Sequence, residues 1–152
     1  MRYFVWISFD GTAYHGWQIQ PNGMSVQEKL QQGLSTLLRQ PIEVTGAGRT
    51  DTGVHARRMA AHFNIGHELD CTQLTYRLNR ILPRDINCEK VEPVDDGLHA
   101  RFSATKRTYR YFIHTQRNPF KRFFSVEMYW QLDFEQMNEA AALLLTIDDF
   151  KA

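Results

Sequence analysis

The sequence IEVTGAGRTDTGVHARRMAAHFNIG fills residues 42–66 and contains two predicted strands. Residues 42–46 form a short apolar segment, and residues 57–66 alternate apolar with polar side chains, which is the period of a half-buried strand. The residues expected on the buried side of the second strand are Met59, Ala61, Phe63 and Ile65. A glycine-rich loop joins the two strands, and the rest of the expected fold is arranged around this pair.

A helix is predicted on each side of the strand pair. Upstream, Ser25 and Glu28 have the spacing of a capping box, and a helix of residues 26–39 follows. Its apolar residues recur at helical spacing, at Val26, Leu30, Leu34, Leu37 and Leu38. Downstream, Asp70 is the expected cap of a second helix of residues 71–82, which ends before a proline.

The outermost elements are strands at residues 2–9 and 86–94. Together with the inner elements they give the order βαββαβ, the split βαβ or ferredoxin-like pattern. We therefore expect an α+β fold with an antiparallel sheet and both helices on one face. The other face of the sheet is then free for a ligand or a second layer.

Further strands and a C-terminal helix are expected to extend this fold. Residues 101–115 predict a long, basic and aromatic strand, residues 123–131 another strand, and residues 133–145 a final helix capped by its first residue. On this basis residues 1–96 form the ferredoxin-like subdomain. Residues 97–152 form a basic strand extension that leads into a second subdomain.

The composition favours a soluble globular protein. A chain of 152 residues with 43% hydrophobic content suits one domain or a compact pair of subdomains. No transmembrane span is predicted, and the brief apolar stretch between Arg2 and Asp10 does not resemble a signal peptide, so we expect a cytoplasmic location. Cys71 and Cys88 are isolated thiols without metal-ligand spacing, and we expect both to be reduced.

The charge distribution is uneven although the formal net charge is only +1. No acidic residue occurs between Asp96 and Glu127, whereas residues 133–149 carry no Lys or Arg. The basic residues of the first stretch are Arg101, Lys106, Arg107, Arg110, Arg117, Lys121 and Arg122. Its aromatic residues are Phe102, Tyr109, Tyr111, Phe112, Phe120, Phe123 and Phe124. Interleaved cations and aromatics indicate nucleic-acid binding, and a solvated charged face is the alternative.

The loop between the two central strands carries the candidate chemistry. Three glycines surround Arg49, Thr50 and Asp51. Because glycine tolerates positive φ and close backbone approach, such a loop can present a carboxylate and a guanidinium at the lip of a cleft. Asp51 is therefore a candidate nucleophile and Arg49 a candidate partner for an anionic substrate. No Gly-Lys-Ser/Thr follows, which excludes a P-loop, and a polar turn is the alternative.

The sequence GAGRTDTGVHA at residues 46–56 resembles the signature of the tRNA pseudouridine synthase A (TruA-type) family, with Thr52 at its variable position. The blocks FDGTAYHGWQIQ at residues 9–20 and LHARFSATKRTYRY at residues 98–111 resemble the family's first and third blocks, in the same order. The family's enzymes continue well past the length of this chain. The chain therefore resembles their N-terminal part only.

The resemblance implies an enzyme that isomerises uridine to pseudouridine in tRNA, in the anticodon arm on its 3′ side. It implies no cofactor, a homodimer in the full-length enzyme, and neither a membrane nor a DNA partner. Asp51 matches the catalytic aspartate, and Tyr109 matches the active-site tyrosine, whose ring can stack on the uracil and whose hydroxyl can move a proton. The residues expected to bind substrate are Arg49, Thr50, Arg57, Arg58, Arg107 and Tyr111.

Other interpretations stay open at this stage. A truncated chain of this family is alternatively an RNA-binding module without turnover, and a structural or protein-interaction domain is a third class. Trp17 is expected to seal the edge of the core, with a contact to an RNA stem as the alternative. No metal site is expected, because the histidines lack paired spacing with Cys or carboxylates. These histidines are His15, His55, His62 and His99.

Overall fold

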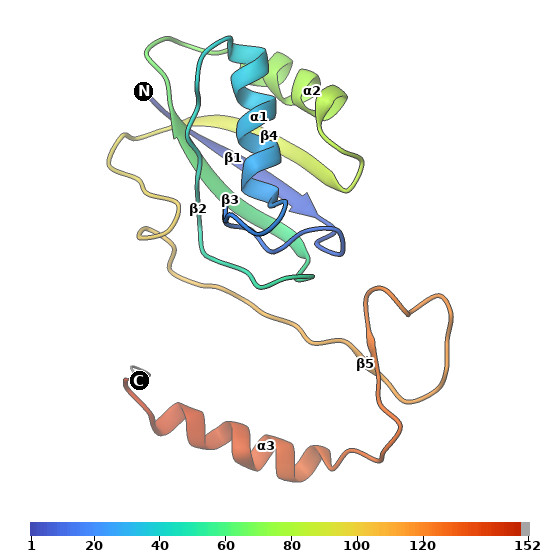
Figure 1. Ribbon diagram of the computed structural model, residues 1–152. Helices are drawn as coiled ribbons and strands as arrows, with labels where there is room; N and C mark the ends of the chain where they lie inside the picture. The colour runs from blue at the N-terminus through green and yellow to red at the C-terminus, as the bar shows by residue number, and fades with distance from the viewer. Residues whose placement is uncertain (150–152) are drawn as a thin grey trace. The chain divides into compact units, whose positions relative to one another are not determined.

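The computed structural model describes residues 1–149, which form two compact units (Figure 1). The first unit comprises Met1–Arg107, and the second begins at Thr108. No helix within residues 1–149 combines the length and the apolar character needed to cross a membrane.

The first unit contains a four-stranded antiparallel sheet and two helices. Its elements are β1 (Arg2–Phe9), α1 (Val26–Leu38), β2 (Thr45–Gly46), β3 (Ala56–Asn64), α2 (Cys71–Ile81) and β4 (Ile86–Val94). The strands lie in the order β2-β3-β1-β4, and every pairing is antiparallel. Both helices cover one face of the sheet (Figure 1). The expected α+β, ferredoxin-like fold is therefore confirmed.

Local signals account for the helix boundaries. The Ser25 hydroxyl accepts a hydrogen bond from the Glu28 amide at 3.2 Å, and the Asp70 carboxylate accepts one from the Gln73 amide at 2.9 Å. Both caps satisfy a backbone donor that has no partner inside the helix. The first helix ends with Arg39 in the left-handed conformation, at φ 56°. The predicted helices are thus confirmed to within a residue.

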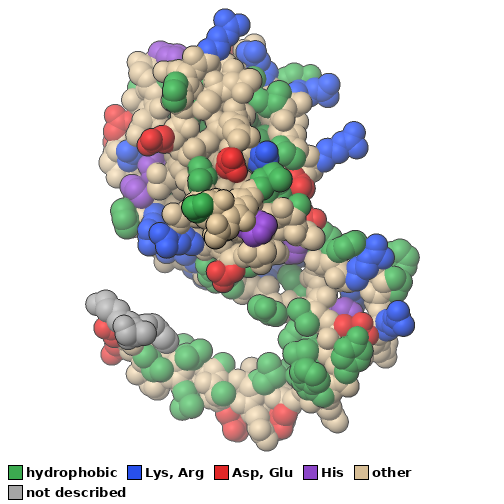
Figure 2. Space-filling model, in the orientation of Figure 1, with side chains coloured by type: hydrophobic (Ala, Val, Ile, Leu, Met, Phe, Trp, Pro, Cys, Tyr) green, Lys and Arg blue, Asp and Glu red, His purple; other side chains and the backbone are tan. Residues whose placement is uncertain are grey.

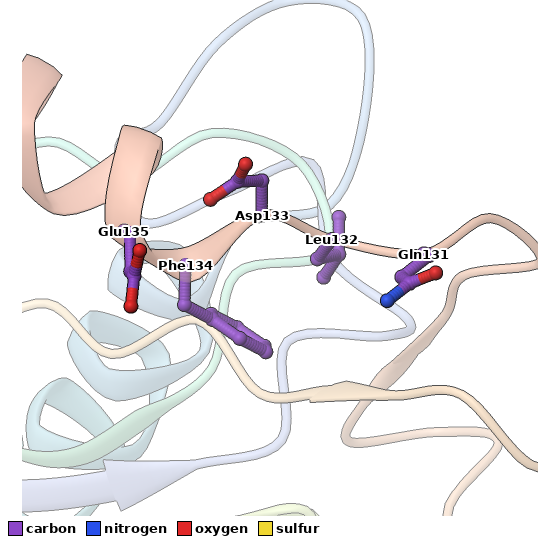
Figure 3. A pocket seen from close by; sticks show the side chains of 5 residues that line it. All are labelled: Gln131, Leu132, Asp133, Phe134 and Glu135. Carbon is purple, nitrogen blue, oxygen red and sulfur yellow. The ribbon is translucent and has the colours of Figure 1, made fainter.

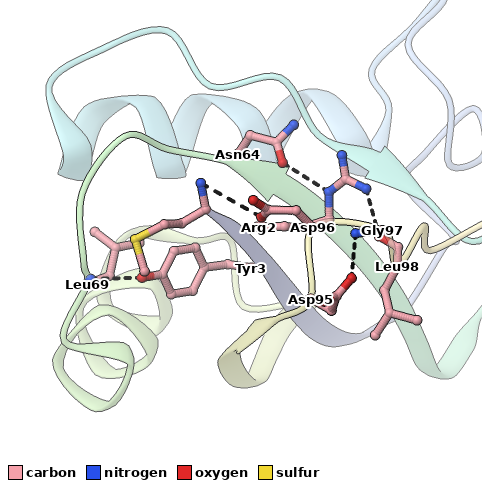
Figure 4. Close-up of polar contacts among 9 residues, drawn as sticks. Arg2, Tyr3, Asn64, Leu69, Asp95, Asp96, Gly97 and Leu98 are labelled. Atoms are coloured by element: carbon pink, nitrogen blue, oxygen red, sulfur yellow. Dashed lines mark hydrogen bonds and ion pairs between the residues drawn. The ribbon is translucent and has the colours of Figure 1, made fainter.

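The core lies between the helices and the sheet, because alternate strand residues point to one face. In β1 the side chains of Tyr3, Val5, Ile7 and Phe9 are buried, and in β3 those of Met59, Ala61 and Phe63 are. The Tyr3 hydroxyl accepts a hydrogen bond from the Leu69 amide at 3.1 Å, so its polar end is satisfied beside α2 (Figure 4). Arg2 belongs to the alternate residues of β1 that point away from this core. It donates to the Asn64 side chain at 3.0 Å and to the Leu98 carbonyl at 2.8 Å (Figure 4).

His62 connects the outward face of β3 to the segment that follows β4. Its side chain is buried, its Nδ1 accepts a hydrogen bond from the Ala100 amide at 3.2 Å, and its ring lies 4.6 Å from that of His99. Burial, and secondarily the positive charge of Arg2, lowers the pKa of His62 from 6.5 to about 4.

We expect His62 to make stability fall on acidification. Its pKa is lower in the folded chain than in the unfolded chain, so below pH 6.5 the unfolded state binds the extra proton. The free energy of unfolding should therefore decrease between pH 6.5 and pH 4, by about 2–3 kcal/mol from this group. Urea denaturation across this range measures the loss. In the control His62→Asn, whose amide oxygen can still accept from Ala100, this part of the loss should disappear; an unchanged pH profile would contradict the assignment.

The second unit has little regular structure before its helix. β5 (Ile113–His114) and β6 (Val126–Glu127) pair in parallel over two residues each. Strands were expected at residues 101–115 and 123–131. That prediction is wrong except at the four residues of β5 and β6. Strand-forming residues need a partner ladder and a covered face, and within the described residues the rest of these segments find neither.

The final helix is α3 (Phe134–Leu143), followed by the 3₁₀ turn η1 (Leu144–Thr146), which confirms the predicted helix. The Asp133 carboxylate caps it, accepting from the Gln136 amide at 3.0 Å. No residue of α3 is buried, and apolar side chains of this unit are exposed in Figure 2. They include Tyr129, Trp130, Phe134, Met137, Leu143 and Leu145. Nothing within the described part of the second unit covers these side chains.

Candidate active site

Asp51 lies in the segment that connects β2 to β3, here called the Asp51 loop (residues 46–56). The residue is exposed, and among the described residues its carboxylate forms no hydrogen bond or ion pair. Its main-chain carbonyl accepts from the Val54 amide at 3.3 Å, closing a turn in which Gly53 has φ 79°. The turn therefore holds the backbone while the carboxylate stays available to a ligand.

A second loop, residues 10–17 (the Gly11 loop), packs directly against the Asp51 loop. A Cβ atom at Gly11 would lie 2.0 Å from the Val54 carbonyl oxygen, and one at Gly16 would lie 2.1 Å from that of Thr50. Gly16 also has φ 82°, a conformation that side chains rarely adopt. The main chain of the Gly11 loop therefore contacts the main chain of the Asp51 loop on both sides of Asp51. Only glycine permits so close an approach at these two positions.

Hydrogen bonds donated by main-chain amides join the same two loops. The Trp17 amide donates to the Thr50 hydroxyl at 3.0 Å, and the Gly53 amide donates to the Tyr14 carbonyl at 3.3 Å. The Trp17 side chain is buried and occupies the space where Gly46 lacks a side chain. Trp17 therefore seals the edge of the core, as expected. Thr50, expected to bind substrate, uses its hydroxyl oxygen to hold the loop.

The arginines expected to contact substrate have different surroundings. Arg49 is exposed in the Asp51 loop, and Arg57 is exposed on β3. The Arg58 guanidinium lies 4.5 Å from the centre of the Trp6 ring, and its Nε is 3.4 Å from a Glu89 carboxylate oxygen. Arg58 thus has a cation–π partner and an ion pair on the sheet.

Arg107 holds the glycine-rich part of the Asp51 loop. Its Nε and Nη2 donate to the Ala47 carbonyl at 3.1 and 2.9 Å, and Nη2 also donates to the Arg101 carbonyl. Ala47 is four residues before Asp51, so Arg107 anchors the N-terminal part of the Asp51 loop. Its expected contact with substrate stays a prediction.

The expected aromatic residues belong to the second unit. Tyr109 and Tyr111 are 73% and 86% exposed, in a segment without regular structure. The first unit thus brings together Asp51, Arg49, Thr50 and Arg107, while the two tyrosines are described only within the second unit.

The residues that anchor the Gly11 loop were not predicted as part of the site. The Tyr14 hydroxyl donates to the Asp85 carboxylate at 2.7 Å, and burial together with this carboxylate raises the pKa of Tyr14. The Asp10 carboxylate accepts from the Thr12 hydroxyl at 2.6 Å, a hydrogen bond that lowers the pKa of Asp10. The contact between Tyr14 and Asp85 joins residues 71 positions apart, so no local pattern in the sequence predicts it.

The second unit has a surface depression of its own. It is lined by Gln131 to Glu135, five consecutive residues at the start of α3 (Figure 3). Asp133 already serves there as the helix cap. A depression formed by five consecutive residues brings together no side chains that are distant in the sequence. The Asp51 loop is therefore the better candidate for the active site. Within residues 1–149, no three metal-ligating His, Cys, Asp or Glu residues cluster.

The fold and the loop define a ferredoxin-like α+β domain that presents an unengaged carboxylate between main-chain anchors. Residues 5–103 match the family model described as tRNA pseudouridine synthase. The chain belongs to that family.

Three relatives named tRNA pseudouridine synthase A match nearly all of this chain. The protein from Bacteroides thetaiotaomicron is 53% identical over 149 residues, which cover 98% of this chain and 55% of the relative. The one from Porphyromonas gingivalis is 48% identical and covers 98% and 60%, and the one from Bacillus subtilis is 40% identical and covers 99% and 62%. The chain therefore spans between half and two thirds of the length of these relatives, and it matches their N-terminal part.

Proposed function

We propose that this chain, within a full-length enzyme, isomerises uridine to pseudouridine in tRNA with Asp51 as the nucleophile. The observation that supports this proposal is the state of Asp51. Its carboxylate is exposed and has no partner among the described residues, while the backbone on both sides of it is anchored. A nucleophile needs this combination of a fixed position and free lone pairs.

The reaction requires no redox chemistry. The N1–C1′ bond of uridine breaks, a C5–C1′ bond forms, C5 loses its proton and N1 gains one. An ionised carboxylate can attack the nucleotide and hold it while the base rotates. Attack on the sugar and attack on C6 of the base are two forms of this proposal. A glycal formed after deprotonation of the nucleotide is the alternative to nucleophilic attack, and no cofactor takes part in any of the three.

The proposed substrate is the anticodon arm of tRNA, bound by a homodimer in the cytoplasm. All seven basic residues between Arg101 and Arg122 are exposed, as are the aromatic residues interleaved with them. Such side chains can neutralise phosphates and stack on bases. Arg49, Arg57 and Arg58 would contact the nucleotide or its backbone. In the second unit, Tyr109 and Tyr111 would stack on the bases.

Tritium release from tRNA labelled at C5 of uridine tests the proposal, because the reaction removes that hydrogen. The assay compares the 152-residue chain with a form completed by the C-terminal part of the Bacteroides thetaiotaomicron relative. We expect release by the completed form. tRNA binding without release by either form would instead support an RNA-binding module.

We expect Tyr109→Phe to lower the rate of tritium release about 10²–10⁴-fold, while tRNA affinity stays near normal. The ring that would stack is kept, and only the hydroxyl that would move a proton is lost. Because Tyr109 is 73% exposed, the substitution should leave stability unchanged. The matched control is Tyr76→Phe, which removes a hydroxyl from an exposed tyrosine on α2. An unaltered rate in Tyr109→Phe would mean that its hydroxyl has no part in the reaction.

We expect tRNA affinity to fall steeply with salt. For each phosphate neutralised on a duplex, log K should decrease by about 0.9 per unit of log salt concentration. The double substitution Lys121→Gln and Arg122→Gln should reduce the size of this slope by up to the contribution of about two phosphate contacts. A flat salt response would support a protein-interaction domain in place of an RNA-binding one.

A further inference from the structure

We propose that His55 is a positioning residue, which holds the Asp51 loop on the Gly11 loop through its Nδ1 atom. This inference rests on the proposed role of Asp51. His55 is four residues after Asp51, at the point where the loop enters β3. It acts on Asp51 through the backbone and touches no reacting atom in this proposal.

The first argument is the hydrogen bond that His55 receives. The Gly11 amide donates to His55 Nδ1 at 3.0 Å, across 44 positions of sequence. Gly11 is buried, and its missing side chain leaves the space that the Val54 carbonyl occupies. The amide is therefore enclosed beside the Asp51 loop, and a buried donor needs an acceptor.

The second argument concerns the proton on the imidazole. His55 Nδ1 also lies 3.0 Å from an Asp10 carboxylate oxygen. A ring nitrogen accepts through its lone pair or donates through its N–H, so Nδ1 cannot accept from the amide and also donate to the carboxylate. The amide of Gly11 can only donate, so the tautomer with its proton on Nε2 fits this hydrogen bond. The same Asp10 oxygen accepts from the Thr12 amide at 3.0 Å and from the Thr12 hydroxyl at 2.6 Å, so it has donors besides His55.

The third argument is the arrangement of acceptors around Asp51. Thr50, immediately before it, accepts from the Trp17 amide at 3.0 Å, and His55 accepts from the Gly11 amide. Both acceptors therefore take main-chain donors of the same Gly11 loop. That loop is itself attached to the core, because the Asp10 amide donates to the Asp85 carbonyl at 2.9 Å. Asp51 thus lies in a segment that is hydrogen-bonded to the Gly11 loop on both sides.

Removal of the acceptor should displace Asp51 without removing any contact to substrate. We expect His55→Ala to lower kcat for isomerisation up to about 100-fold, because small displacements of a reacting group cost rate to this extent. KM should stay within about twofold. A substrate-binding role for His55 would change KM instead.

Two further substitutions separate the Nδ1 acceptor from the bulk of the ring. The amide oxygen of asparagine reaches the position of Nδ1, so His55→Asn should retain kcat within about threefold of the wild type. Glutamine places its amide near the position of Nε2, so His55→Gln should lose rate like alanine. His67→Ala, at an exposed histidine outside both loops, is the matched control and should leave kcat unchanged.

Hydrogen exchange of the Gly11 amide, measured by NMR in the 152-residue chain, tests the contact without activity. We expect exchange to be at least about tenfold faster in His55→Gln and His55→Ala than in the wild type, and near normal in His55→Asn. If the alanine variant does not fold, the glutamine and asparagine pair makes the same comparison. Equal exchange in the wild type and His55→Gln overturns the proposal, as does equal kcat in these two proteins. If the wild-type enzyme isomerises no uridine, the proposed function fails, whereas the exchange result still decides the contact.

Discussion

Asp51→Asn is expected to abolish pseudouridine formation in the full-length enzyme and to leave tRNA binding near normal. The substitution keeps the size of the side chain and removes the anionic oxygen that would attack the nucleotide. Loss of a covalent nucleophile lowers kcat by several orders of magnitude, here on the order of 10⁴-fold or more. Tritium release and a tRNA binding isotherm measure the two quantities.

The structure also predicts that Asp51→Asn does not weaken the fold. The Asp51 carboxylate is exposed and has no partner within residues 1–149, so the free energy of unfolding should change by less than about 0.5 kcal/mol. Asp96→Asn, at an exposed aspartate next to the N-terminus, is the matched control and should keep full activity. Isomerisation by Asp51→Asn at a rate close to that of the wild type would refute the assignment.

Gly16→Ala is expected to destabilise the first unit strongly, whereas Gly53→Ala should have a smaller effect. Both glycines have nearly the same positive φ, 82° at Gly16 and 79° at Gly53. An alanine in this conformation costs roughly 1–2 kcal/mol. At Gly16 the new methyl group would also lie 2.1 Å from the Thr50 carbonyl oxygen, whereas at Gly53 no atom lies within 4 Å.

The added overlap at Gly16 should cost about 1–3 kcal/mol more, since the backbone of Thr50 has to move. Urea denaturation of the two variants gives the difference directly, because the conformational cost is common to both. A Gly16→Ala protein that fails to fold beside a folded Gly53→Ala protein is the same result in a stronger form. Equal losses in the two variants would mean that the two loops do not meet as closely as the structure shows.

The first unit was predictable from the sequence because its signals are local. The caps at Ser25 and Asp70 each act within three residues, and the alternation in β1 and β3 repeats every second residue. Each of these patterns agrees with the fold that the others imply, which is why the order βαββαβ could be predicted.

The segment from residue 101 to 131 could not be predicted in the same way. It is rich in Phe and Tyr, which favour strands, but a strand forms only where another strand offers hydrogen bonds. The described residues supply such a partner only at Ile113–His114 and Val126–Glu127. Propensity alone therefore overestimated the sheet.

The candidate site also has features that local sequence predicts and contacts that only the tertiary structure shows. The loop that carries Asp51, the carboxylate proposed as the nucleophile, and the glycines around it lie within eleven consecutive residues, because a turn depends on residues that are neighbours in the sequence. Only the tertiary structure placed the Gly11 amide on His55 and the Trp17 amide on Thr50, across 44 and 33 positions of the chain. Such contacts depend on how the sheet brings two distant loops to one edge, and no local pattern encodes the distance between them.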